Sequence, residues 1–403
     1  MTTLRIAVIF GNFGPYHIAR LAAAARHCDL LAIEVASVRS VYAWQPTSDV
    51  PFQRQTLFQV KGEDKDWKEL VKRLTAALDA YRPDVVVIPG WGFVEAAAAL
   101  RWAATQRIPV VVMSDSQEID FPRTRIKEWI KCRYLRLCQT ALVGGTSHRA
   151  YLESLGMPAE CIWNGYDVVD NDYFATGADD ARSMAERLRR QHGLPERYFL
   201  ASARFVPKKN LHRLIRAYGD YRRAATGSAG DRNNCWDLVL LGDGELRTEL
   251  EDLIHQLILD DVVYLPGFKQ YAELPLCYGL ASGFIQASST EQWGLVVNEA
   301  MAAGLPVLVS KRCGCAVDLV EIGRNGFTFD PHSQAEIKRL LLLLASDGID
   351  RAVMGEASRR IIERWSPELF ARNLVAAAKA AMALPTRRVF PVDRLLMAAL
   401  IRR

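Results

Sequence analysis

SGFIQASSTEQWGLVVNEAMAAGLPVLVS, residues 282–310, predicts a buried strand, a loop, a helix and a second strand in that order. The runs GFIQA and PVLVS show no alternation of apolar and polar residues, which is typical of parallel strands covered on both faces. Gly304 follows the apolar run of the helix and predicts its end. The segment is therefore a strand–helix–strand unit whose two strands lie parallel.

The same pattern recurs along all 403 residues. Short apolar runs, each followed by a turn and a helical pattern, stand in the first part as LRIAVIF, DVVVIP and IPVVVM, and in the second as RYFLASA, DLVLLG and VVYLPG. A chain of this length exceeds what one hydrophobic core usually supports. The sequence therefore predicts an α/β protein of two doubly wound parallel-sheet domains.

The domain boundaries follow from a change in composition. Residues 172–196 are polar and charged, carry no strand signal, and are interpreted as the linker. We expect an N-terminal domain at 1–175, a C-terminal domain at 196–365, and helices at 366–403 that cross back to the first domain.

Bulk properties exclude several classes of protein. The net charge of +5 is modest, and no aromatic and basic platform stands out, so nucleic-acid binding is not expected. The eight cysteines lack metal-ligand spacing, and the first apolar run is too short for a signal peptide. A cytoplasmic protein with reduced thiols is predicted, and no run of about 18 apolar residues indicates a membrane span.

Two carboxylates flank the turn in the opening segment. Glu291 lies in the loop after the strand, Glu299 lies inside the helix, and Gly294, Leu295 and Val296 begin that helix. Backbone amides at a helix N-terminus attract phosphate, whereas nearby carboxylates suit the hydroxyls of a sugar or ribose. Taken alone, the pattern also fits a solvated loop glutamate and a glutamate that complements the helix dipole.

Two cations follow the strand RYFLASA in the same way. Arg204 and Lys209 lie in the loop before the next helix, where they would neutralise a leaving diphosphate. A solvated basic loop is the alternative.

These residues resemble the family-four retaining glycosyltransferases, also called glycosyltransferase group 1. The E-x7-E motif appears as EQWGLVVNE, and SARFVPKKN, LVLLGDGEL, VVYLPGF and WNGYDVVDNDYF resemble further family segments. The resemblance implies the GT-B architecture, in which two Rossmann-like domains face across a cleft. It also implies transfer of a hexose from a UDP- or GDP-linked sugar with retained configuration.

The resemblance implies a role for each matching residue in the second half. Glu291, Arg204 and Lys209 would be catalytic, and Glu299 would bind the ribose. The amides of Gly294, Leu295 and Val296 would hold the diphosphate, with Gly267 and Phe268 beside the base.

The first half matches more loosely. In GNFGPYHIAR, Gly14 would let the backbone approach the donor, and His17 and Arg20 would face the acceptor. Many relatives carry a histidine near the reacting sugar, where this chain has Asp115 and Ser116. Those two residues and Trp91 are placed on the acceptor side, and no general base is identified.

The expected partners are the nucleotide sugar and a glycan or lipid-linked acceptor. No metal or other cofactor is predicted, because Asp170-x-Asp172 lies at the linker rather than in a metal-binding architecture. The segment 122–138 holds six basic residues and one acidic residue among aromatic and aliphatic ones, as an interfacial helix does. Peripheral contact with the inner face of the cytoplasmic membrane, in bacterial cell-surface polysaccharide or glycolipid synthesis, is the resulting hypothesis.

Two alternatives stay open. A sugar-nucleotide epimerase of the same architecture would turn over its nucleotide without an acceptor, and a non-catalytic assembly subunit would keep the fold without turnover.

Overall fold

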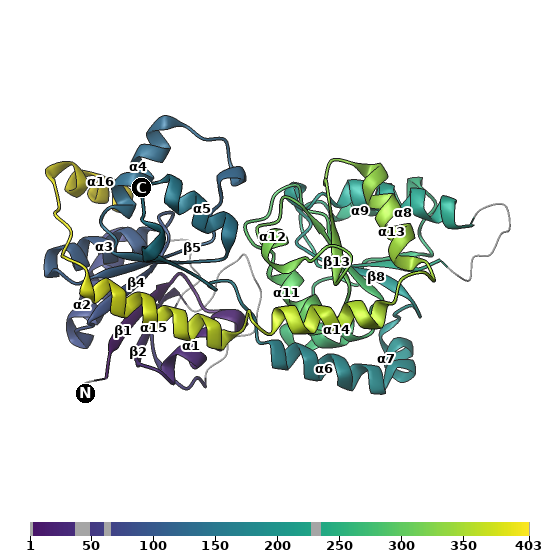
Figure 1. Ribbon diagram of the computed structural model, residues 1–403, viewed down its shortest axis with the longest axis horizontal. Helices are drawn as coiled ribbons and strands as arrows, with labels where there is room; N and C mark the ends of the chain where they lie inside the picture. Colours follow the sequence, from purple (N-terminus) through teal and green to yellow (C-terminus); the bar gives the residue numbers. More distant parts are fainter. Residues whose placement is uncertain (1–2, 37–48, 60–65, 227–234, 403) are drawn as a thin grey trace. The chain divides into compact units, whose positions relative to one another are not determined.

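The computed structural model describes residues 3–36, 49–59, 66–226 and 235–402. The chain divides into two compact units, one of residues 1–169 together with 365–403 and one of residues 170–364. Each unit is built around its own parallel sheet, as the ribbon in Figure 1 shows.

The sheet of the first unit has seven strands in the order β3-β2-β1-β4-β5-β6-β7, all parallel. The strands are β1 Arg5–Phe10, β2 Asp29–Ala36, β3 Gln53–Phe58, β4 Val85–Pro89, β5 Val110–Ser114, β6 Thr140–Val143 and β7 Ile162–Asn164. The apolar runs predicted as buried strands become β1, β4 and β5, whose described residues are nearly all buried.

Helices cover both faces of this sheet. One face carries α1 Pro15–Ala25 and α15 Pro367–Ala383, which lie side by side (Figure 1). The other carries α2 Trp67–Tyr81, α3 Val94–Gln106, α4 Arg125–Leu135 and α5 Thr146–Ser154, with α16 Pro391–Arg402 packed against α3 and α4. The C-terminal helices α15 and α16 are therefore part of the first unit.

The sheet of the second unit has six parallel strands in the order β10-β9-β8-β11-β12-β13. They are β8 Tyr198–Ser202, β9 Asp237–Leu241, β10 Val263–Tyr264, β11 Gly283–Gln286, β12 Val307–Ser310 and β13 Gly326–Phe329. Counted from its first strand, this order is 3-2-1-4-5-6, the doubly wound Rossmann arrangement, and the first six strands of the other sheet repeat it. The predicted fold class is confirmed.

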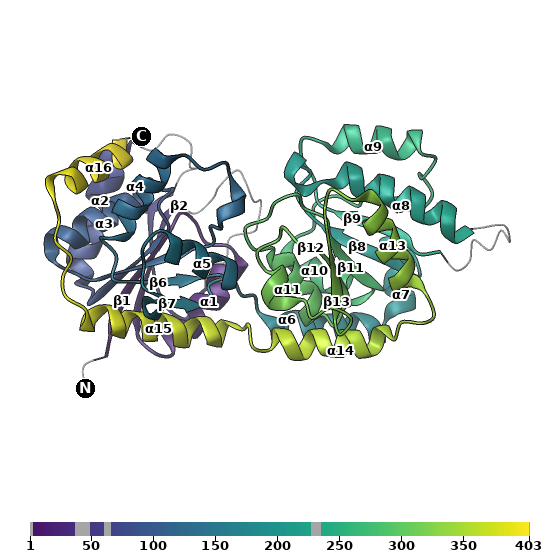
Figure 2. The same ribbon diagram turned by 45° about the horizontal axis from the view of Figure 1, so that its top comes forward.

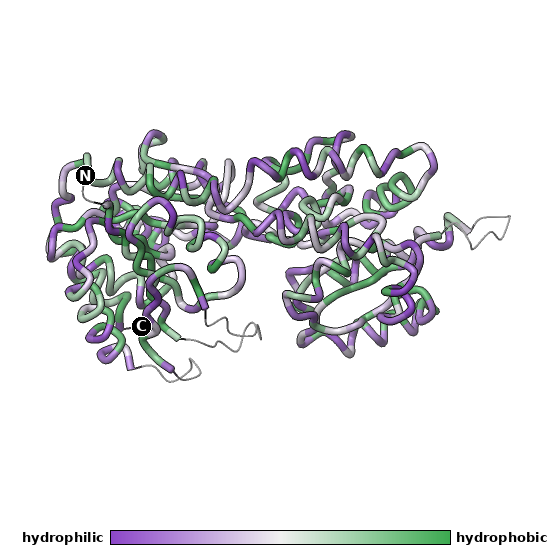
Figure 3. Tube along the Cα trace, turned by 90° about the horizontal axis from the view of Figure 1, so that it is seen from below, coloured by the Kyte–Doolittle hydropathy of each residue, from purple (hydrophilic) through white to green (hydrophobic). Residues whose placement is uncertain are grey.

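The helices of the second unit also lie on both faces. On one face α8 Leu211–Thr226, α9 Arg247–Gln256 and α13 Gln334–Ala345 build a core with the strands, and Figure 2 shows α8 beside α13. Further helices of the unit are α10 Leu274–Gly279, α11 Leu295–Ala302, α12 Ala316–Leu319 and α14 Arg351–Ile362. Hydrophobic residues gather in the strands at the centre of each unit (Figure 3).

The segment interpreted as a linker is helical. Residues 171–192 form α6 Asn171–Ser183 and α7 Ala185–His192, and α6 packs against α10 and α11 of the second unit. Its buried Phe174, Ala178 and Ala181 are spaced four and three residues apart, so one helical face is apolar although the segment as a whole is polar. Composition alone missed this face.

Candidate functional site

The loops at the carboxyl ends of β8 and β11 mark the candidate site in the second unit. These strands are neighbours in the sheet, and the chain leaves them in opposite directions. Doubly wound sheets bind ligands at such a switch point, because the two diverging loops leave room between them. The segments that follow are residues 203–210 and 287–294, which hold all three predicted catalytic residues, Arg204, Lys209 and Glu291.

Glu291 and Lys209 form an ion pair at this point. The Lys209 ammonium donates to Oε2 of Glu291, and the two side chains are only 13% and 12% exposed. The hydroxyl of Ser288 donates to the same oxygen over 3.3 Å, and the ammonium of Lys208 lies 3.6 Å from Oε1. Two residues separated by 82 positions are thus brought into contact.

The charge state of Glu291 follows from these neighbours. Burial alone would raise the pKa of its carboxyl, but Lys209 and Lys208 outweigh burial and hold the pKa below its ordinary value. Glu291 is therefore an anion at neutral pH, and Lys209 is its counterion.

Helix α11 begins directly behind this pair. Gly294 precedes the helix with φ 104°, a left-handed conformation that side chains rarely adopt. The amide of Val297 donates to the carbonyl of Gly294 over 2.8 Å, which closes the first turn. Gly294, Leu295 and Val296 are partly exposed, so the start of the helix is open to a ligand.

Glu299 lies deeper in the same helix and is fully buried. The hydroxyl of Tyr278 donates to its Oε2 over 2.6 Å, and burial together with the Glu299 charge raises the pKa of Tyr271. Tyr271 in turn stacks on Tyr173 of α6, with ring centroids 4.7 Å apart. Sequence reasoning missed these tyrosines, since none of them lies in the glutamate motif.

The remaining residues of the donor side lie on adjoining loops. Arg204 is exposed in the loop after β8, and Phe268 is 41% exposed in the loop after β10. The amide of Gly242 donates to the carbonyl of Gly267 over 3.0 Å, and that of Ala203 donates to Leu241 over 2.9 Å. These bonds join the loops that follow β8, β9 and β10.

The backbone conformation and surroundings of residue 242 explain why this junction needs a glycine. Its φ is 127°, and a β-carbon there would lie 1.8 Å from the carbonyl oxygen of Ala203. The Gly-Asp-Gly turn seen in the sequence therefore allows two backbone segments to approach closely.

In the first unit, the predicted residues lie on loops of the other sheet. Gly14 caps α1, and its amide donates to Nδ1 of His17 over 3.1 Å. The His17 ring stands edge-on to Phe10, with centroids 4.6 Å apart. His17 thus stabilises the loop that contains Gly14.

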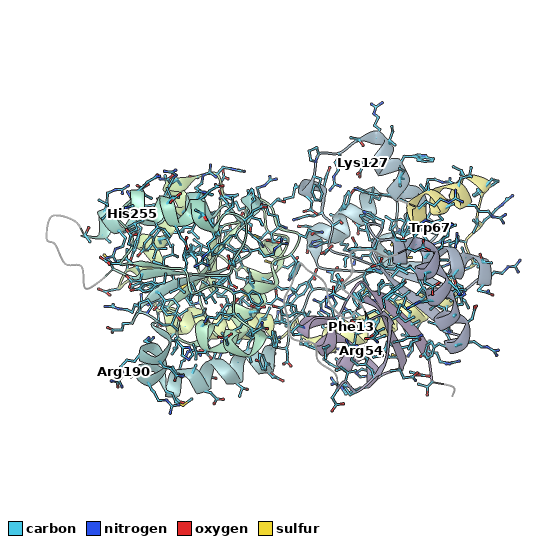
Figure 4. All side chains as sticks on the ribbon, turned by 180° about the vertical axis from the view of Figure 1, so that it is seen from behind. Phe13, Arg54, Trp67, Lys127, Arg190 and His255 are labelled. Atoms are coloured by element: carbon cyan, nitrogen blue, oxygen red, sulfur yellow. The ribbon has the colours of Figure 1, made fainter. Side chains whose placement is uncertain are left out.

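Glu34 is a second anchor of this loop, and sequence reasoning missed it. Its fully buried carboxylate accepts the Phe13 amide over 3.0 Å, the Thr56 hydroxyl over 2.7 Å and Arg54 Nη2 over 2.6 Å. Figure 4 labels Phe13 and Arg54, whose guanidinium lies 5.3 Å from the centre of the Phe13 ring. A glutamate inside the apolar run DLLAIEVA was the available signal.

The side chain of Arg20 is buried in the interior of the first unit. Its side chain is 3% exposed, its Nε donates to the carbonyl of Val168 over 3.1 Å, and its Nη2 lies 3.8 Å from Asp167. Burial, and after it the charge of Asp115, raises the pKa of Asp167 to about 7, although Arg20 opposes this. In the structure, the charge of Arg20 therefore lies beside the Asp167 carboxyl. A contact between Arg20 and an acceptor stays a prediction.

The other acceptor-side residues are half-buried at the carboxyl ends of strands. Trp91 follows β4, with its ring 6.3 Å from Tyr151. Asp115 and Ser116 follow β5, and the amide of Ser116 donates to the Ser114 hydroxyl over 3.2 Å. Their role toward an acceptor also stays a prediction.

The predicted absence of a metal or other cofactor stays a prediction. In the part of the chain that the structure describes, no group of three His, Cys, Asp or Glu side chains gathers as a metal site requires. Asp170 caps α6 by accepting the amide of Tyr173 over 3.0 Å. All eight cysteines are free thiols, and burial raises the pKa of Cys313 and Cys315.

Comparison with known proteins finds a match to one sequence family within the second unit. Residues 184–361 match the family described as glycosyl transferases group 1. The predicted resemblance to glycosyltransferase group 1 is thereby confirmed for this part of the chain.

Curated relatives match over less than half of the chain. A probable sucrose-phosphate synthase 5 of Oryza sativa subsp. japonica is 32% identical over 176 residues, which is 41% of this chain and 17% of that protein. The sucrose-phosphate synthase of Zea mays is 34% identical over 157 residues, 37% of this chain and 14% of that protein. The chain thus matches less than a fifth of the length of these relatives.

Solved structures match over nearly the whole chain. HepE of Anabaena, in complex with UDP and glucose, has a TM-score of 0.70 at 18% identity and covers 93% of this chain and 98% of its own. Sucrose-phosphate synthase of Thermosynechococcus elongatus has a TM-score of 0.68 at 17% identity, and the match covers 98% of this chain and 100% of that protein's chain. WaaG, a glycosyltransferase involved in lipopolysaccharide biosynthesis, has a TM-score of 0.63 at 16% identity, and the match covers 92% of this chain and 98% of the WaaG chain. These likenesses show that the fold is GT-B.

Proposed function

We propose that this chain, whose residues 184–361 carry the glycosyl transferases group 1 sequence family, moves a sugar from a nucleotide diphosphate to a glycan or lipid-linked acceptor. The observation that carries the proposal is the Glu291–Lys209 ion pair beside the open N-terminus of α11. Cations and helix amides suit a diphosphate, and a carboxylate suits sugar hydroxyls.

Retention of configuration is part of the proposal. The bond between the anomeric carbon and the diphosphate oxygen breaks, and the acceptor oxygen bonds to the same carbon from the same face. The acceptor proton passes to the departing diphosphate, so neither a metal nor a protein base is required. Lys209, Arg204 and the amides of residues 294–296 stabilise the negative charge that develops on the leaving group.

The donor is proposed to carry uridine or guanosine diphosphate. HepE, which shares the fold, is described in complex with UDP and glucose, and this favours UDP. Glu299 would accept ribose hydroxyls once a ligand displaces the Tyr278 hydroxyl or reaches the second carboxylate oxygen. Phe268 would lie beside the base.

The acceptor and location are inferred from a solved structure of the same fold. Among the described residues, no helix is both long enough and apolar enough to cross a bilayer. WaaG, which shares the fold, is involved in lipopolysaccharide biosynthesis, which favours a cytoplasmic role in cell-surface polysaccharide or glycolipid synthesis at the inner face of the membrane.

Calorimetry tests the donor site first. Wild type, Arg204→Ala and Arg216→Ala are titrated with UDP, GDP, ADP and their glucose conjugates; Arg216 is a matched control because it is exposed on α8, away from the loop. We expect one diphosphate to bind wild type and the control, and to bind Arg204→Ala about 10- to 100-fold more weakly. Absence of binding by all of them would favour the non-catalytic alternative.

Turnover then separates the transferase from the epimerase. Each bound sugar nucleotide is incubated with and without a membrane extract that supplies acceptors, and free diphosphate and epimerised sugar are measured. Glu299→Ala should mainly weaken nucleotide binding, whereas Glu291→Ala should mainly lower turnover. Epimerised sugar nucleotide without acceptor would refute the transferase reading.

A further inference from the structure

Helices α4 and α16 of the first unit present apolar side chains to solvent. On α4, Ile126 is 74% and Trp129 51% exposed, three residues apart and so on one face. Phe121, in the loop that leads to this helix, is 71% exposed. Contiguous apolar surface of this kind marks an interaction site on most soluble proteins.

Helix α16, next to α4, also presents apolar side chains to solvent. It packs beside α4, as Figures 1 and 2 show. Met397 and Ile401 are buried against the core of the first unit, while Leu395 is 72% and Val392 37% exposed on the other side. A surface helix with one apolar face packed inside usually turns a polar face outward, whereas the outward side of α16 carries Val392 and Leu395 beside Arg394.

The two helices are held together by a buried carboxylate. Asp393 is fully buried at the start of α16, and Arg133 Nη2 of α4 donates to it over 2.6 Å. Arg136 pairs with the second oxygen of Asp393. The exposed apolar residues of α4 and α16 are therefore fixed relative to one another.

Most basic side chains of residues 122–138 bind other residues of the first unit, and only the remaining ones are available to a partner outside it. Of the six basic residues in 122–138, Lys131 pairs with Glu128 at 2.9 Å, Arg133 and Arg136 pair with Asp393, and Arg123 bonds Tyr151 at 2.8 Å. Arg125 and Lys127 are exposed, and their side chains have no bond to a described residue; Figure 4 labels Lys127 on α4. Arg394 of α16 is exposed in the same way.

We propose that the face formed by Phe121, Ile126, Trp129, Val392 and Leu395, edged by Arg125, Lys127 and Arg394, docks on a bilayer that contains anionic lipids. The carboxylates of the two helices, Glu128 and Asp393, pair with internal cations, so the exposed charges of α4 and α16 are positive. Apolar side chains enter the acyl boundary while the cations contact lipid phosphates.

The position of the face deepens the proposed function, on which this step rests. Phe121 lies six residues after Asp115, in the segment that leaves the carboxyl end of β5. A lipid-linked acceptor held in the bilayer would then reach the acceptor side without leaving the membrane.

Vesicle co-sedimentation tests the docking face independently of the donor. Wild type, Ile126→Ser, Trp129→Ser and the control Ile258→Ser are mixed with vesicles of phosphatidylcholine, with and without one quarter phosphatidylglycerol. Ile258 is 88% exposed on the second unit and has the same chemistry as Ile126. We expect wild type and the control to bind anionic vesicles, and each α4 variant to bind about tenfold more weakly.

Charge is tested in the same assay. The double variant Arg125→Glu/Lys127→Glu should lose binding to anionic vesicles at low salt, and raised salt should weaken wild type. Equal binding of wild type and the α4 variants, or no binding by wild type, would overturn the proposal. A wild-type dimer that Trp129→Ser makes monomeric in light scattering would assign the face to a second copy instead.

UDP titration of the same variants keeps the two proposals apart. Unchanged UDP affinity with lost vesicle binding supports the docking face. Retained vesicle binding without any nucleotide binding would refute the proposed function while leaving the docking face in place.

Discussion

Replacing Glu291 by glutamine removes the charge of the carboxylate and keeps its shape. Lys209, only 13% exposed, then loses its counterion. Removing one partner of a buried ion pair typically costs about 3–5 kcal/mol of folding free energy. Both side chains keep some exposure to solvent, so we expect a smaller loss of about 1–3 kcal/mol.

A double-mutant cycle isolates the pair. Urea unfolding is measured at pH 7 for wild type, Glu291→Gln, Lys209→Met and the double variant. The coupling free energy should lie at about 1–2 kcal/mol, within the range for residues in direct contact. A coupling below about 0.5 kcal/mol would refute the reasoning, since independent sites are additive within that margin.

The pH dependence of the unfolding free energy is a second test of the ion pair, because the lowered pKa of Glu291 determines the direction of the change. Because the pKa of Glu291 is lowered in the folded protein, its charge stabilises the fold above the ordinary value of 4.5. That stabilisation is lost as the pH falls below 4.5 toward the lowered folded value. The difference between wild type and Glu291→Gln should be constant from pH 6 to 8 and should shrink on acidification; a difference that grows there would contradict the ion pair.

Three further substitutions probe the neighbouring structure. Gly294→Ala forces a side chain into a left-handed conformation at φ 104° and should cost about 1–3 kcal/mol, measured by urea unfolding, together with weaker nucleotide binding. Tyr278→Phe removes the 2.6 Å hydrogen bond to the buried Glu299 and should cost about 1.5–3 kcal/mol; a loss within experimental error would show that another donor replaces it. Glu34→Gln weakens the anchor on the Phe13 amide, so amide hydrogen exchange should accelerate in residues 11–14 but not in the second unit.

Local sequence patterns predicted the fold class because they report local burial. All residues of a continuous apolar run such as Val85–Pro89 are buried only when both faces of the strand are covered. The same holds for the motif around Glu291, Gly294 and Glu299, where strand, turn and helix are neighbours in the chain. Composition failed at α6, because the mean polarity of a segment says nothing about which face of a helix is apolar.

Contacts between distant residues were decided by the tertiary structure alone. Lys209 and Glu291 meet because β8 and β11 are adjacent in the sheet, and Arg133 meets Asp393 from 260 positions away because α16 returns to the first unit. The sequence shows six basic residues in 122–138, and the fold gives four of them internal partners, namely Glu128, Asp393 and Tyr151. Local burial is encoded residue by residue, whereas the pairing of charges depends on strand order and helix packing, and the cost of burying an unpaired charge selects the pairs that remain.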